Sequence, residues 1–213
     1  MKTLSECRLY AFVDAAYLRG RAPSAVARQL CDGGADLIQL RAKGRPLTEI
    51  RAMAEAILPI TRAAGVGLVI NDYPKLAQEL GAECCHLGQE DFFDPGHQHI
   101  SELGNSGSGL RIGLSTHGPE QAQRAVSAGA DYVAIGPVYA TATKPGARPV
   151  TLDYVRWAKD HLSVPWFAIG GINLENLDAV LKAGATRICV VSEILNAADV
   201  AAACAAFGRR LEG

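Results

Sequence analysis

Short apolar runs alternate with longer helix-like segments along almost the whole chain, and this alternation restricts the fold more than any other feature. Eight of these runs are apolar at successive positions, which is typical of parallel strands covered on both faces. The predicted strands are residues 9–13, 37–40, 67–70, 84–87, 111–114, 132–135, 166–169 and 187–191.

The segments between these runs carry the end signals of helices. Proline begins several of them, as at Pro23, and glycine follows several, as at Gly65. Eight strand–helix units in 213 residues predict an α/β chain of one domain, residues 1–213, folded as a single (β/α)8 TIM barrel. A doubly wound open sheet is the alternative. The predicted helices are residues 23–30, 47–64, 74–80, 94–103 (the weakest), 119–128, 152–161, 174–183 and 200–211.

Charge and composition restrict the classes of molecule to which the chain could bind. A net charge of -1 argues against a nucleic-acid surface, which normally has a basic excess. No apolar run approaches the roughly 18 residues that span a bilayer, and the first residues lack the apolar core of a signal peptide. We therefore expect a cytoplasmic protein that binds neither nucleic acid nor membrane.

The six cysteines fit a reducing compartment, because none of them forms a Cys-x-x-Cys pair. Their one cluster is Cys84-Cys85-His86. Neighbours on a strand face opposite ways, so Cys85 does not share a face with the other two. We expect packed, reduced thiols here rather than a zinc site.

Charged and amide side chains stand at the ends of several apolar runs. Gln39, Arg41 and Lys43 alternate with apolar residues, so all three point to the same side of the strand. Asp72 follows the next run and Asp91 the one after it. Cations beside carboxylates indicate a polyanion that is bound together with a hard metal ion.

Later strands end in groups that suit phosphate. Gly170-Gly171 and Val191-Ser192 follow the seventh and eighth strands, where barrels of this class commonly bind phosphate. The alternative for the glycines is a tight turn without a ligand. Ser115 and His117 end the fifth strand, and a polar contact to substrate is a better interpretation than a nucleophile, because no Gly-x-Ser-x-Gly elbow is present.

As an ordered set, these motifs resemble the thiamine phosphate synthase (thiamine-phosphate pyrophosphorylase) family over residues 9–207. Members of that family are (β/α)8 barrels that join a hydroxymethylpyrimidine diphosphate to a thiazole phosphate and release pyrophosphate. The motifs that carry the resemblance are Gln39-Leu40-Arg41-Ala42-Lys43, Asn71-Asp72, His86-Leu87-Gly88-Gln89-Glu90-Asp91, Gly113-Leu114-Ser115-Thr116-His117, Gly136-Pro137, Thr141-Ala142-Thr143-Lys144, Ala168-Ile169-Gly170-Gly171-Ile172 and Val191-Ser192.

The resemblance implies a role for each motif. Asp72 and Asp91 would hold magnesium (Mg²⁺), the expected cofactor. Arg41, Lys43, Ser115 and Lys144 would act directly on the departing diphosphate or the pyrimidine. The residues that would bind the pyrimidine diphosphate are Gln39, Leu40, Arg41, Ala42, Lys43, Asn71, Ser115 and Lys144, and those at the thiazole phosphate are Thr141, Thr143, Gly171, Val191 and Ser192. Ala142 would also bind substrate.

The chemistry of that family is regarded as dissociative, so it needs electrostatics, positioning and exclusion of water rather than a protein nucleophile. One departure from the family pattern is Tyr73, which stands where arginine usually follows Asn-Asp.

Two other functions stay open. A related thiazole tautomerase would use a base such as His117 without metal. The other is a non-catalytic binder of phosphorylated metabolites, or another phosphate-binding barrel such as a sugar-phosphate isomerase, because the fold alone does not separate these functions.

Overall fold

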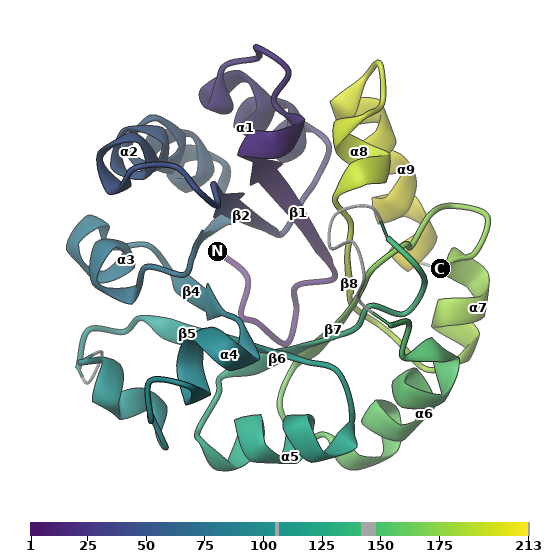
Figure 1. Ribbon diagram of the computed structural model, residues 1–213. Helices are drawn as coiled ribbons and strands as arrows, with labels where there is room; N and C mark the ends of the chain where they lie inside the picture. The colour runs from purple at the N-terminus through teal and green to yellow at the C-terminus, as the bar shows by residue number, and fades with distance from the viewer. Residues whose placement is uncertain (105–106, 142–147, 213) are drawn as a thin grey trace.

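The computed structural model describes residues 1–104, 107–141 and 148–212, and it confirms the predicted barrel. Eight parallel strands pair in chain order, and β8 pairs with β1 to close the barrel (Figure 1). The strands are β1 (Leu9–Asp14), β2 (Leu37–Arg41), β3 (Gly67–Asn71), β4 (Cys84–Leu87), β5 (Arg111–Thr116), β6 (Tyr132–Ile135), β7 (Trp166–Ile169) and β8 (Ile188–Cys189).

Helices connect the strands and form a ring around them (Figure 1). Proline at the first turn starts α1, α3 and α5, as the sequence indicated, because that position needs no N–H donor. The helices are η1 (Ala15–Tyr17), α1 (Pro23–Asp32), α2 (Leu47–Ala64), α3 (Pro74–Leu80), α4 (Gln89–Phe93), η2 (Ile100–Leu103), α5 (Pro119–Ser127), α6 (Thr151–His161), α7 (Leu177–Lys182), α8 (Ser192–Leu195) and α9 (Val200–Glu212).

The last strand is shorter than the predicted residues 187–191. Val190 N–H still donates to the Tyr10 carbonyl at 3.0 Å, so pairing with β1 continues just past β8. Val191 then leaves the extended conformation, with φ -115 and ψ -83, and becomes the N-cap of α8. This bend turns Val191 and Ser192 toward the rim of the barrel.

Two helices also differ from their predicted bounds. The weak segment 94–103 contains only the short helix η2, while α4 begins earlier, directly after β4. Helix α7 begins at Leu177 rather than at residue 174, because the Asn173 side chain accepts the N–H groups of Glu175 and Asn176 and holds a turn there.

Aromatic side chains fill the barrel interior. The rings of Tyr10, Tyr132 and Phe167 meet edge to face, with centroids 5.4 Å apart for Tyr10–Phe167 and 5.7 Å for Tyr132–Phe167. Gly113 makes room for this cluster, since a Cβ there would lie 2.0 Å from the Tyr132 ring. The buried rings fill the barrel beneath the carboxyl ends of the strands, and we call this aromatic cluster the floor.

The cysteines have the predicted character, being unpaired thiols, and Cys84 and Cys85 are buried. Within the described ranges, no helix combines the length and apolar composition that crossing a bilayer requires.

Candidate active site

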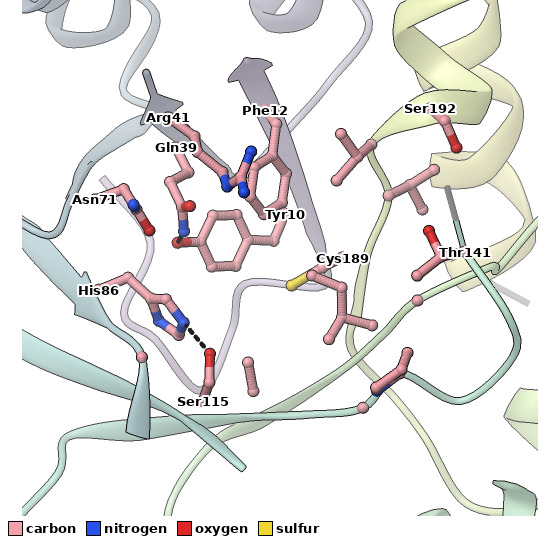
Figure 2. A pocket seen from close by; sticks show the side chains of 18 of the residues that line it. Tyr10, Phe12, Gln39, Arg41, Asn71, His86, Ser115, Thr141, Cys189 and Ser192 are labelled. Atoms are coloured by element: carbon pink, nitrogen blue, oxygen red, sulfur yellow. Dashed lines mark hydrogen bonds between the residues drawn. The ribbon is translucent and has the colours of Figure 1, made fainter. Parts of the chain in front are cut away.

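A cavity of about 510 Å³ opens at the carboxyl ends of the strands. Figure 2 shows side chains from several strands directed toward it. It brings together most of the residues that the sequence predicted, including groups far apart in the chain. The predicted site residues that line the cavity are Gln39, Arg41, Lys43, Asn71, Asp72, Asp91, Ser115, Thr141, Gly171, Val191 and Ser192.

Five predicted residues are not among those lining it. Leu40 and Ala42 are buried, and Leu40 alternates with Gln39 and Arg41, so its side chain faces the opposite side of β2. These two contribute at most their backbone to a ligand. Ala142, Thr143 and Lys144 lie outside the described residues.

Two aspartates and a lysine form the acidic part of the rim. Lys43 Nζ lies 3.4 Å from Asp72 Oδ2 and 3.7 Å from Asp91 Oδ2, so both carboxylates face one point. Asp72 has φ 67, a left-handed conformation that aspartate tolerates better than most residues. Burial raises the pKa of Asp72, and the nearby Lys43 ammonium opposes that rise.

The chemistry of this pair fits a divalent cation such as magnesium. Asp72 Oδ1 is buried and has no hydrogen-bond partner, which is costly unless a ligand satisfies it. Gly88 leaves space beside Asp91, because a Cβ there would lie 2.6 Å from Asp91 Oδ2. Across residues 1–104, 107–141 and 148–212, no group of three or more His, Cys, Asp or Glu side chains could enclose a metal. Magnesium bound by two carboxylates and by substrate oxygens matches this donor set.

Arg41 is held by a residue that sequence reasoning missed. Its Nη1 donates to Asp14 Oδ2 at 2.8 Å, and the Asp14 side chain is only 2% exposed. The sequence contains a signal that could have identified Asp14 as a rim residue, because Asp14 follows the first apolar run as Asp72 follows the third. What the sequence does not give is the strand register that makes Asp14 the partner of Arg41.

Gln39 is tied to the aromatic floor. Its Nε2 donates to the Tyr10 hydroxyl at 2.6 Å, and that hydroxyl lies 3.2 Å from the Tyr132 hydroxyl. The Gln39 amide is therefore fixed in the wall of the cavity, and the floor beneath it also contains Phe12 and Cys189. This region can accept a flat, partly apolar ring with a polar edge.

Ser115 pairs across strands with His86 rather than with its sequence neighbour His117. The His86 Nε2 and Ser115 Oγ atoms are 2.9 Å apart (Figure 2). His117 Nδ1 instead bonds to the Gly136 carbonyl oxygen, and its backbone N–H donates to Gln121. Burial lowers the pKa of His86 to about 4, so its imidazole is neutral at physiological pH.

This shift has a consequence for stability. An unfolded histidine takes up its proton near pH 6.5, whereas the folded His86 resists protonation down to about pH 4. The unfolded state therefore binds more protons in this window, and His86 lowers the free energy of unfolding as the pH falls from about 6.5 to about 4, by roughly 3 kcal/mol in total. We expect the His86→Gln variant to lose about 3 kcal/mol less unfolding free energy than the wild type when the pH falls from 7.5 to 4. Urea unfolding of both metal-free proteins measures this difference. If the unfolding free energy of the two proteins changes equally with pH, the expectation is contradicted.

The turn after β7 packs closely against the loop after β6. Gly170 and Gly171 have φ 100 and 64, and a Cβ on Gly171 would lie 2.6 Å from the Ala140 carbonyl oxygen. Asn176 Nδ2 donates to the Gly171 carbonyl at 2.8 Å and fixes the turn. The glycines are thus required by packing, and they also bring backbone to the cavity wall next to Thr141.

Val191 and Ser192 complete this side of the rim at the start of α8. The Leu195 N–H donates to the Val191 carbonyl, which leaves the N–H groups of the first helical turn directed out of the helix. Tyr73, which stands where the family that the motifs resemble usually has arginine, packs against the hydrophobic core beside α3.

Known proteins share this chain's sequence and fold. The family model described as thiamine monophosphate synthase matches residues 9–194. The thiamine-phosphate synthase of Thermus thermophilus is 47% identical over 182 residues, which is 85% of each chain. That of Acidothermus cellulolyticus is 42% identical over 211 residues, covering 98% of this chain and 97% of the relative.

A solved structure agrees with these matches. The thiamine phosphate pyrophosphorylase from Pyrococcus furiosus superposes with a TM-score of 0.85 at 29% identity, over 98% of this chain and 97% of that one. Because the family model matches residues 9–194 and both relatives match over at least 85% of their length, the chain belongs to the thiamine monophosphate synthase family of transferases.

Proposed function

We propose that the protein is a thiamine-phosphate synthase, which joins the methylene carbon of hydroxymethylpyrimidine diphosphate to the ring nitrogen of a thiazole phosphate and releases pyrophosphate. The observation that carries this proposal is the cluster of Lys43, Asp72 and Asp91 on the cavity rim. One carboxylate oxygen of each aspartate lies within 4 Å of the Lys43 ammonium group. A rim with both cations and metal-binding carboxylates suits a diphosphate leaving group.

The charged residues would stabilise the departing diphosphate. Arg41 and Lys43 line the same part of the cavity, where negative charge grows on the oxygen that leaves the methylene carbon. Asp72 and Asp91 would hold magnesium, which would neutralise the diphosphate and assist its departure. Lys144, predicted for the same task, lies outside the described residues and stays a prediction.

The floor and wall of the cavity would orient the pyrimidine. Gln39 and Ser115 present polar atoms that are fixed by Tyr10 and His86. The aromatic floor would keep water away from the reacting carbon. The C–O bond to the diphosphate breaks, and the thiazole nitrogen supplies the electron pair for the new C–N bond. No step in this sequence needs a protein nucleophile.

The opposite side of the rim would bind the thiazole phosphate. Thr141, Gly171, Val191 and Ser192 line the cavity there, where backbone can approach an anion closely. Two anion-binding regions in one cavity match a reaction with two phosphorylated substrates.

The direct experiment mixes the purified protein with both phosphorylated substrates and Mg²⁺, and follows thiamine phosphate and pyrophosphate by chromatography. We expect equal amounts of both products, with formation abolished by EDTA. A folded protein that gives neither product rejects the proposal. Metal-independent isomerisation of a thiazole phosphate would indicate the tautomerase, and tight thiamine phosphate binding without turnover would indicate a binder.

A further inference from the structure

We propose that Asp14 is a positioning residue for diphosphate binding, because its buried carboxylate fixes the guanidinium of Arg41 in the cavity wall. This inference rests on the proposed function, since it assumes that Arg41 contacts the diphosphate. Asp14 itself is a positioning residue and not a catalytic one, because its buried side chain acts through Arg41.

The backbone places the two residues side by side. Asp14 is the last residue of β1 and Arg41 the last of β2, and their Cα atoms are register partners in the parallel pair. Directly paired residues on neighbouring strands direct their side chains to the same face of the sheet. The ion pair therefore follows from the register rather than from a flexible encounter between side chains.

Both oxygens of the Asp14 carboxylate are engaged on the protein side. Oδ2 accepts from Arg41 Nη1 at 2.8 Å, and Oδ1 accepts from the Ala16 N–H at 3.0 Å, where Asp14 caps the short helix η1. The second bond fixes the rotation of the carboxylate, and this in turn fixes the guanidinium. A carboxylate held at both oxygens is a rigid support for a long side chain.

The other end of the pair reaches the cavity. Arg41 lines it and its side chain is 23% exposed, against 2% for Asp14. A guanidinium carries five N–H donors in a planar fork, so the bond from Nη1 leaves the donors on Nε and Nη2 for an anion. Without Asp14 the same cation would sample several rotamers, and an incoming diphosphate would have to order it.

The test is a double-mutant cycle with inorganic pyrophosphate as the probe. Calorimetry of the protein with Mg²⁺ compares the wild type, Asp14→Asn, Arg41→Gln and the double variant. Asparagine keeps an oxygen for the Ala16 N–H but removes the charge that holds Arg41. We expect Asp14→Asn to weaken pyrophosphate binding about tenfold, and to have little further effect once Arg41 is replaced.

A matched control is Asp131→Asn. Asp131 also accepts a backbone N–H, that of Ile112 at 2.7 Å, but it precedes β6 at the opposite end of the barrel. It should leave pyrophosphate binding unchanged. In steady-state assays Asp14→Asn should raise the KM for the pyrimidine diphosphate and leave that for the thiazole phosphate unchanged. If Asp14→Asn does not fold, Asp14→Ser keeps a capping oxygen and replaces it in the cycle.

The possible results separate this inference from the proposed function. Equal losses from Asp14→Asn in the wild-type and Arg41→Gln backgrounds would overturn the inference and leave the synthase proposal intact. A wild type that binds no pyrophosphate overturns it as well. Coupled binding losses in a protein that makes no thiamine phosphate would support the positioning role and reject the synthase.

Discussion

Asp72→Asn is expected to lose about 100- to 1000-fold in turnover while the protein stays fully folded. The substitution removes one of the two carboxylates that would hold the proposed magnesium ion against the diphosphate, and the loss of a single electrostatic contact in an active site commonly costs this much. Asparagine is the appropriate replacement, because φ 67 at this position suits it, whereas alanine would add backbone strain of about 1 kcal/mol.

The free energy of unfolding should not fall together with turnover in the Asp72→Asn variant. Burial raises the pKa of Asp72 in the folded state, so the folded protein holds this proton more tightly than the unfolded chain does. The charged carboxylate therefore lowers the free energy of unfolding above its folded pKa, and this penalty disappears below the unfolded value near pH 4. At pH 7 we expect Asp72→Asn to be at least as stable as the wild type in urea.

Asp153→Asn is the matched control. Asp153 is a surface aspartate on α6, 87% exposed, and it pairs with Arg156. It should retain full turnover. An Asp72→Asn protein that keeps more than a tenth of wild-type turnover at the same Mg²⁺ concentration would remove the acidic pair from the mechanism.

The sequence was enough to predict the rim at which the candidate site lies. The alternation of polar with apolar residues and the number of strands determine that rim. Gln39, Arg41 and Lys43 alternate with apolar residues, and the carboxyl ends of parallel strands meet at one rim. The cavity accordingly contains these three side chains together with Asp72 and Asp91. The motif match extended to Leu40 as well, but alternation turns that side chain away from the cavity.

Pairings between strands were not predictable, because they depend on register. Ser115 and His117 are close in sequence, yet Ser115 bonds to His86 on the neighbouring strand β4. Asp14 directly follows the predicted first strand, and only the strand register places it opposite Arg41. A single sequence shows which side of a strand a residue faces, but it does not show how far one strand slides along the next.

Lys43→Met should separate turnover from metal binding. Its ammonium group lies 3.4 Å from Asp72 Oδ2 and 3.7 Å from Asp91 Oδ2, where it would compete with the proposed divalent cation for the same carboxylates. Removing it should lower turnover about 100-fold, since the departing diphosphate loses a cation. Without substrate, the same change should tighten Mn²⁺ or Mg²⁺ binding about two- to fivefold, as expected for the loss of two partly exposed ion pairs.

Titration of the metal into the substrate-free protein, followed by calorimetry or by the electron paramagnetic resonance of Mn²⁺, measures the second effect. Lys2→Met is the control, because Lys2 also pairs with an aspartate, Asp36 at 2.6 Å, but the lysine lies in the N-terminal segment before β1. It should change neither turnover nor metal affinity. Weaker metal binding in Lys43→Met would mean that the lysine organises the two aspartates instead of competing for them.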